Sequence, residues 1–307
     1  MSHAHHPAAG RALSLHIGVN TVDPIHYAGW SGPLAACEFD ARDMATVATS
    51  RQFDPTLLLT AEATRGAVIR QLRAAAAALR AGDRFFLTFS GHGGQVDDTS
   101  GDDDETDRLD ETWCLHDGQL IDDELYYELS RFAAGVRILV LSDSCHSGTA
   151  VRAGPPSAAS LAGEPRRVRQ MPSATARAVY EAHRPFYDSL QRAVKAAVDE
   201  EVDAGARDPD AALAQVPTPT RIAPLVRRFR PSVVLISGCQ DNQFSMDGAH
   251  NGAFTERLLT VWDGGRFHGS LERFHAHIVA GMPPTQSPNL FTLGPAQAML
   301  EQAPLAP

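Results

Sequence analysis

The sequence predicts an α/β fold in which a mostly parallel central sheet of about six strands is covered by helices on both faces. Strand-like and helix-like segments alternate along most of the 307 residues, and strands separated by helices are typical of such a sheet. Two of the strand-like runs, Phe85 to Phe89 and Ile138 to Leu141, are short and almost entirely apolar, as expected for central strands. The length suits one large domain or two small ones.

The predicted strands are short runs of mainly apolar residues: Leu13 to Val19, Thr56 to Leu59, Phe85 to Phe89, Arg137 to Ser142, Ser232 to Ser237 and Pro288 to Leu293. The predicted helices lie between or after them: Leu34 to Ser50, Thr64 to Arg80 with Thr64 as the N-cap, Leu120 to Phe132, Asn251 to Trp262 and Ser270 to Ala280. The pattern is interrupted at residues 151–230, which are rich in Ala, Pro and Arg and contain one amphipathic helix at about Pro185 to Val202.

Two central strands are each followed by a reactive side chain. The first run leads into Ser90-Gly91-His92-Gly93-Gly94, and the second leads into Asp143-Ser144-Cys145-His146-Ser147. The active site of an α/β sheet lies outside the carboxyl ends of its strands, and a thiol with an imidazole is the minimum equipment for covalent acyl transfer. We therefore predict Cys145 as the nucleophile and His92 as the general base and acid. His146 is a weaker candidate, because its ring would tend to point away from the adjacent thiol.

These motifs resemble the caspase-like cysteine peptidases and, within them, the metacaspase branch of bacterial type. Animal caspases carry Q-A-C-x-G around the nucleophile, whereas this chain has D-S-C-H-S-G, which is the metacaspase form. The spacing of about 50 residues between His92 and Cys145 is also that of caspases. Further matching pieces occur in the family's order: Ile17-Gly18-Val19-Asn20, Cys37-x-x-Asp40-Ala41, Asp110-Glu111-Thr112, Leu120-Ile121-Asp122-Asp123-Glu124-Leu125 and Ile236-Ser237-Gly238-Cys239.

The resemblance covers roughly residues 11–148 and 231–294 and implies a caspase-like fold. It divides the chain into a large-subunit-like catalytic part at 11–150, an insert or processing linker at 151–230, and a small-subunit-like part at 231–307. Residues 1–10 are expected to be a disordered tail, as chain termini often are. Two alternatives stay open. One is a catalytically silent scaffold with the same fold, and the other is a caspase-fold peptidase that cleaves after Asn or Asp.

The resemblance also implies the roles of several site residues. The backbone N–H groups of Gly93 and Cys145 would form the oxyanion hole. Asp40, Ser90 and Asp143 would line the pocket for the residue before the scissile bond, and two carboxylates there would select a cation, Arg before Lys. The expected substrates are therefore proteins or peptides with Arg or Lys at that position. On the alternative interpretation, Asp143 caps a turn and Asp40 faces solvent.

The segment from Asp97 to Asp123 is dense in acidic residues, and such a cluster attracts a hard cation such as Ca²⁺. By resemblance to calcium-dependent metacaspases, the ligands would be Asp107, Asp122 and Asp123, with Asp110 as a fourth. No EF-hand spacing is present. The alternative is a solvated acidic loop, and no organic cofactor is expected.

The arginine-rich insert begins within a few residues of the predicted nucleophile. A tethered segment reaches a nearby site at an effective concentration near millimolar, so even a mediocre cleavage site there would compete with free substrate. We predict that the insert covers the cleft until it is cut after Arg166, Arg167 or Arg169, by the enzyme itself or by an upstream activating protease. The alternative is an insertion without function.

Composition limits the remaining possibilities. The formal net charge of −10 argues against a nucleic-acid binder. The sequence has neither an apolar run long enough for a membrane span nor a secretory signal, which predicts a soluble, cytoplasmic protein. Its four cysteines, at positions 37, 114, 145 and 239, form no Cys-x-x-Cys pair and are expected to be reduced. The resemblance favours a monomer.

Overall fold

The centre of the molecule is a six-stranded sheet whose strands lie in the order β2-β1-β3-β7-β8-β9. The computed structural model describes residues 10–97, 109–145, 167–205, 229–239 and 243–307. The strands are β1 (Ala12–Gly18), β2 (Asp54–Leu59), β3 (Arg84–Ser90), β7 (Arg137–Asp143), β8 (Ser232–Ser237) and β9 (Asn289–Leu293). The first five are parallel and β9 is an antiparallel edge strand. The predicted α/β fold with a mostly parallel six-stranded sheet is confirmed.

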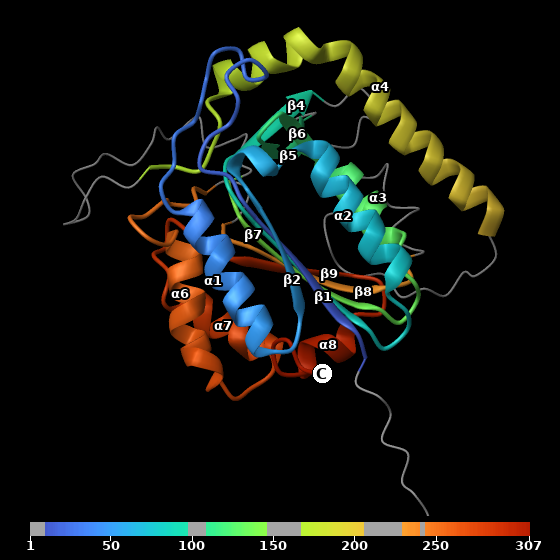
Figure 1. Cartoon of the computed structure of the whole chain (residues 1–307), viewed down its shortest axis with the longest axis vertical. Helices are drawn as coiled ribbons and strands as arrows, with labels where there is room; N and C mark the ends of the chain where they lie inside the picture. Colours follow the sequence, from blue (N-terminus) through green and yellow to red (C-terminus); the bar gives the residue numbers. More distant parts are fainter. Residues whose placement is uncertain (1–9, 98–108, 146–166, 206–228, 240–242) are drawn as a thin grey trace, which may run out of the picture.

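Helices cover both faces of this sheet, as Figure 1 shows. One face carries α1 (Cys37–Ser50), α6 (Ala253–Trp262) and α7 (Leu271–Ala280), and the other carries α2 (Arg65–Ala78) and α3 (Asp122–Ser130). Each face has its own cluster of buried apolar side chains, which is why the central strands are apolar on both sides. Short helical turns follow β2, α6 and β9: Thr60–Glu62, Asp263–Gly265 and α8 (Gln297–Glu301).

Three helices begin two or three residues later than the sequence predicts, including the one predicted from Asn251, which begins at Ala253. The helix predicted from Leu34 begins at Cys37, and the N–H groups of residues 34–36 before it donate to Asn20 O and to the Asp247 carboxylate. The helix predicted from Leu120 begins at Asp122, because Leu120 and Ile121 pair with a neighbouring strand. The predicted N-cap is present: the Thr64 hydroxyl accepts a hydrogen bond from Ala67 N at 3.2 Å.

A small antiparallel sheet that the sequence analysis did not predict follows the His92 turn. Its strands are β4 (Gly93–Asp97), β5 (Leu109–Leu115) and β6 (Gly118–Ile121). The main sheet and this sheet meet at Trp113, whose ring stacks on Phe89 with centroids 4.5 Å apart and whose Nε1 donates to Ser142 Oγ. The chain that carries His92 is therefore held between two sheets.

Within the insert, one long helix, α4 (Ser173–Gly205), lies across α3 and the small sheet. The predicted start at Pro185 is wrong, because the helix runs 33 residues and Pro185 lies inside it. Val179, Tyr180, Tyr187 and Val194 of α4 are buried in the apolar cluster of that face. Packing energy of this kind outweighs the helical hydrogen bond that a proline removes.

No helix in the described ranges combines the length and the apolar character that crossing a lipid bilayer requires.

Candidate active site

The ends of β3 and β7 lie side by side and bring the two predicted catalytic segments together. Ser90 and Asp143 are register partners at the last pair of these parallel strands. The turns that follow carry His92 and Cys145 to the same edge of the sheet. This is the edge where parallel α/β sheets place their ligands.

Cys145 is fully buried, and its thiol contacts the backbone of Ser245. The sulfur lies 3.4 Å from Ser245 O and also accepts a hydrogen bond from Ser245 N. The thiol is therefore held by the chain segment that follows β8, and it has to leave this contact before it can approach an imidazole.

His92 is buried, and one of its two ring nitrogens carries no proton. Its Nε2 lies 2.9 Å from Gly32 O, and since a carbonyl only accepts, Nε2 carries the ring proton. Nδ1 is then an unprotonated acceptor, and it has no hydrogen-bond partner among the described residues. Burial lowers the pKa of His92 to about 4, an effect that the Gly32 hydrogen bond only partly offsets. The ring, packed at 4.7 Å from the Trp30 ring, is thus neutral at pH 7, as a general base has to be.

The backbone donors expected to form the oxyanion hole converge on a single oxygen. Gly93 N and Cys145 N both donate to the carbonyl oxygen of Arg169, at 3.0 and 3.1 Å. Position 93 has no room for a side chain, because a Cβ there would lie 1.7 Å from Cys145 O. Glycine is therefore required for this close approach of the two turns.

The Arg169 side chain fills a buried, acidic pocket at the same edge. Its guanidinium lies 2.7 Å from Asp40, 2.9 Å from Asp143 and 3.0 Å from Asp247, and it donates to Ser90 Oγ at 2.8 Å. The side chain has no exposed surface. Burial alone would lower the pKa of this guanidinium, but the carboxylates of Asp143, Asp40 and Asp247 raise it overall, so the group is fully charged.

The pocket carboxylates are held by other donors as well. Asp40 Oδ1 accepts from the Asn251 amide at 3.0 Å and from Gly252 N at 3.1 Å, and Asp143 Oδ2 accepts from Thr255 Oγ1 at 2.8 Å. Burial raises the pKa of Asp40 to about 6, against the opposing effect of Arg169. Such a preorganised anionic pocket is complementary to a guanidinium.

Residues 167–171 cross the site between two isolated β-bridges, one from Val168 to Met246 and one from Gln170 to Gly93. Arg169 N donates to Ser245 O at 3.0 Å and Asp247 N donates to Arg167 O at 2.7 Å, which forms a short antiparallel pairing. On the other side of Arg169, Met171 N donates to Gly93 O at 2.8 Å. An extended peptide added to the edge of a protein strand is a common mode of peptide recognition.

Of the four predicted metal ligands, the structure describes Asp110, Asp122 and Asp123. Asp107 lies outside the described residues. Asp110 is buried and accepts from Gln191 Nε2 at 2.8 Å, while Asp122 and Asp123 begin α3, where Asp123 N donates to Asp122 Oδ1. In the described ranges, no three His, Cys, Asp or Glu side chains are placed to hold one metal ion.

The two predicted processing residues that the structure describes, Arg167 and Arg169, lie in different surroundings. Arg169 occupies the acidic pocket, whereas Arg167 is exposed and donates to Pro33 O at 2.7 Å. Arg166, like the rival imidazole His146, lies outside the described residues. The four cysteines are free thiols, as expected.

Sequence reasoning missed the contribution of the segment after β8. Ser245, which holds the Cys145 thiol, and Asp247, which holds the Arg169 guanidinium, occur in a Ser-Met-Asp run without any motif. Their role arises only because this segment pairs with residues 167–169. The sequence around Trp30, whose ring packs on His92, also contains no motif that indicates a role in the site.

A family model described as the caspase domain matches residues 17–304. The chain belongs to the caspase-domain family. Metacaspase-1 of Pyricularia oryzae is 32% identical over 157 residues, which are 46% of this chain and 38% of that protein. Metacaspase-1 of Mycosarcoma maydis is 35% identical over 156 residues, which are 46% of this chain and 37% of that protein. The predicted membership among metacaspase-like, caspase-fold proteins is confirmed.

This caspase-domain chain also resembles a solved structure along nearly its whole length. A crystal structure of a protein from Geobacter sulfurreducens is 48% identical, with a TM-score of 0.77, and the match covers 96% of this chain and 98% of that one. By contrast, the chain spans little more than a third of the length of the metacaspases named above.

Proposed function

We propose that the protein is a cysteine endopeptidase that cleaves after Arg, and less readily after Lys, through a thioester on Cys145. The observation that carries the proposal is Arg169, whose guanidinium is bound by three carboxylates while its carbonyl oxygen accepts from Gly93 N and Cys145 N. This is the arrangement expected of a residue just before a scissile bond.

In this proposal, His92 Nδ1 removes the thiol proton after Cys145 has rotated away from Ser245. The thiolate attacks the carbonyl carbon, and the two backbone N–H groups stabilise the oxyanion, a contribution of about 3 kcal/mol per donor in comparable sites. His92 then gives the proton to the departing amine, and water hydrolyses the thioester.

The specificity part of the proposal rests on charge. Removing a guanidinium from water is costly unless its charge is compensated, and here three buried carboxylates compensate it. An Asp side chain at this position would face like charges. The pocket therefore argues against the alternative of cleavage after Asp.

We further propose that the insert is a tethered substrate and that Arg169, rather than Arg166 or Arg167, precedes the bond that is cut. The Arg169 carbonyl oxygen accepts from Cys145 N at 3.1 Å, which brings the Arg169–Gln170 bond next to the backbone of the predicted nucleophile. In this proposal, residues 167–171 block access for other substrates. Because Arg169 is fully buried, an external protease cannot reach it in this conformation. Cleavage at this bond is therefore self-processing.

A role for Ca²⁺ remains a proposal. The described carboxylates do not fit a calcium site by themselves, since Asp110 is already engaged by Gln191 and no described group of three ligands forms. A site would need Asp107 or its neighbours. Calorimetry would support the proposal if the unaltered protein binds Ca²⁺ more tightly than millimolar and Asp107→Asn does not. An absent heat signal, with a rate unchanged by chelator, would contradict it.

The test of the proposed function is a fluorogenic peptide panel with Arg, Lys, Asp or Asn before the scissile bond, run with Ca²⁺ and with chelator. We expect turnover of the Arg peptide, slower turnover of the Lys peptide, and none in Cys145→Ala. His92→Ala should lose turnover while keeping the fold. Turnover of the Asp peptide alone would show that the pocket is misassigned, and inertness toward the whole panel after processing would favour a silent scaffold.

A further inference from the structure

We propose that Asp247 is a third pocket carboxylate that makes the site select Arg over Lys before the scissile bond. The proposal rests on the proposed function and assigns a role to a residue outside the predicted site. Asp247 reaches the pocket from the segment after β8, whereas Asp40 lies on α1 and Asp143 ends β7.

The two terminal nitrogens of the Arg169 guanidinium contact two different sets of acceptors. Nη2 lies 2.7 Å from Asp40 Oδ2 and 3.0 Å from Asp247 Oδ1. Nη1 lies 2.8 Å from Ser90 Oγ, 2.9 Å from Asp143 Oδ2 and 3.2 Å from Asp143 O. The acceptors are thus matched to the two terminal nitrogens of the planar guanidinium, whereas Nε has no hydrogen-bond partner among the described residues.

A lysine ammonium cannot use this arrangement equally well. It is a single charged point on a flexible stem, whereas the guanidinium presents donors at two separated positions. An ammonium close to Asp143 and Ser90 would leave Asp247 uncompensated, and one placed between Asp40 and Asp247 would abandon Asp143. A buried carboxylate left without its partner is costly. The third carboxylate therefore penalises Lys more than Arg.

The carboxylate of Asp247 is fixed in place by the start of α1. Ala35 N donates to Oδ2 at 2.8 Å, and Ala36 N donates to Oδ1 at 3.3 Å. The backbone of Asp247 also holds the substrate strand through its bond to Arg167 O. Asp247 thus contacts both the Arg169 side chain and the backbone of the bound segment.

The first test compares kcat/KM for matched Arg and Lys peptides in Asp247→Asn and Asp247→Ser. Both variants lose the charge but keep an oxygen that can accept from Ala35 N. Each variant is first incubated until mass spectrometry shows that the cut after Arg169 is complete, so that the tethered arginine no longer competes. We expect a loss of about 10- to 100-fold for the Arg peptide, the range for a lost hydrogen bond to a charged group, and a smaller loss for the Lys peptide.

The matched control is Asp43→Asn. Asp43 lies on the same helix as Asp40 and accepts from Asn251 Nδ2 at 2.8 Å, but it makes no contact with Arg169 in the described structure. This variant should leave the Arg-to-Lys ratio unchanged. Equal losses for both peptides in Asp247→Asn would overturn the proposal and reduce Asp247 to a structural anchor.

A second test does not need turnover and so separates this inference from the proposed function. In the full chain carrying Cys145→Ala, added trypsin should produce the Gln170 N-terminus slowly, because Arg169 is buried. Asp247→Asn should accelerate that cut about tenfold or more at an unchanged melting temperature, while Asp43→Asn should not. In an Arg169→Lys chain, Asp247→Asn should change the cut much less. An unaltered rate after Arg169 in Asp247→Asn would refute the proposal even if the peptide panel succeeds.

Discussion

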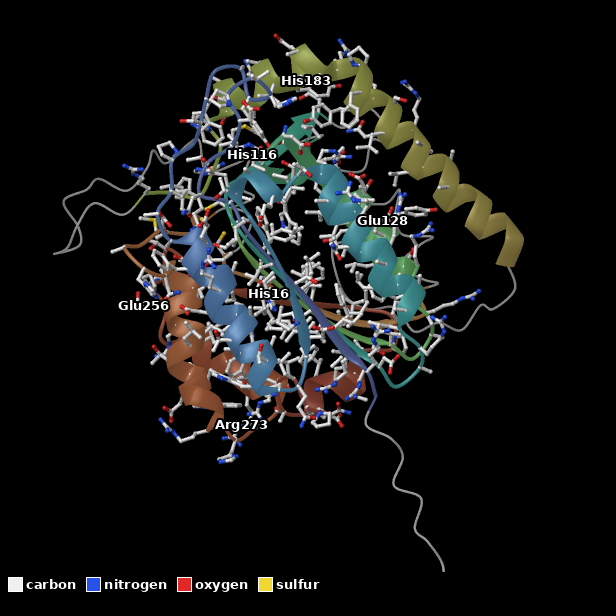
Figure 2. All side chains as sticks on the ribbon, viewed as in Figure 1. His16, His116, Glu128, His183, Glu256 and Arg273 are labelled. Carbon is white, nitrogen blue, oxygen red and sulfur yellow. The ribbon has the colours of Figure 1, made fainter. Side chains whose placement is uncertain are left out.

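Single residues at the centre of this structure have little freedom to change, and Gly93 and His16 show two different reasons. At Gly93, two turns approach so closely that a methyl group would collide with Cys145 O. At His16, the constraint is the cost of placing a charge in the protein interior, because the imidazole is buried within the sheet (Figure 2). Its Nδ1 lies 2.9 Å from Thr88 Oγ1, and its Nε2 lies 2.9 Å from Ser14 Oγ. Steric contact therefore restricts substitution at Gly93, and burial of a titratable group restricts it at His16. Each effect can be measured with a variant.

We expect Gly93→Ala to abolish self-processing and peptide turnover while leaving most of the fold in place. The added Cβ forces the turns after β3 and β7 apart, which separates the two N–H donors that share the Arg169 carbonyl. Loss of one donor costs about 10²- to 10³-fold in kcat in comparable sites. The measurement is kcat with the Arg peptide, beside far-ultraviolet circular dichroism. Activity near that of the unaltered protein would mean that Gly93 N does not stabilise the oxyanion.

The buried histidine predicts a loss of stability in mild acid. Burial lowers the pKa of His16 to about 3, below its value in the unfolded chain, so the unfolded state binds more protons as the pH falls below about 6.5. Between pH 7 and pH 5 this costs about 2 kcal/mol of unfolding free energy. His92 acts in the same direction and Asp40, whose pKa is raised, opposes both.

Urea unfolding at pH 7 and pH 5 measures this effect. His16→Asn should reduce the difference in unfolding free energy between the two pH values, even though the variant is less stable at pH 7. An unchanged pH slope would mean that folding does not lower the pKa of His16.

Among the secondary-structure elements, α4 is the one that determines whether the tethered strand stays in the cleft. The helix begins at Ser173, only four residues after Arg169, and it is anchored through Tyr187, whose hydroxyl accepts from Gln119 N at 3.3 Å. Arg65 links the same region, lying near both the Phe186 ring and the Glu124 carboxylate. The docked helix therefore restrains residues 170–172.

Tyr187→Ala should loosen this helix and hasten exposure of Arg169. Tyr187 is 2% exposed, and truncating a buried aromatic side chain costs about 3–5 kcal/mol. The neighbouring Phe186 is 48% exposed, so Phe186→Ala is the matched control and should cost less than about 1 kcal/mol. Hydrogen exchange of residues 167–171 is the measurement. Equal exchange rates in the two variants would mean that the docking of α4 does not control the exposure of residues 167–171.

The elements also show how far sequence alone reaches. The six central strands were predictable because each is a compact apolar run, and the site's Cys145 and His92 because each directly follows such a run. The small sheet was not predictable, because Gly93 to Asp97 and Leu109 to Leu115 lack the alternation of apolar and polar residues that distinguishes a strand from a polar loop. Asp247 was not predictable because its function depends on a contact with a segment some eighty residues earlier.

At the scale of the whole molecule, the candidate site is assembled from both sides of the insert. Asp40, His92 and Cys145 come before it, Ser245 and Asp247 come after it, and the insert itself supplies the bound arginine. β7 and β8, the strands that flank the insert, are neighbours in one sheet, so the two parts can stay together after the chain between them is cut. A cut at Arg169 would therefore open the cleft without dividing the core.

The most direct test of this account is to incubate the purified full-length chain and determine the N-termini of any fragments by mass spectrometry. We predict one major cut that depends on Cys145, with a new N-terminus at Gln170, and with release of activity toward the Arg peptide in step with the cut. Neither Cys145→Ala nor Arg169→Gln should produce this fragment. An intact chain that is already fully active, or a fragment beginning at Gln170 that also forms in Cys145→Ala, would contradict the claim that Arg169 is held as a substrate.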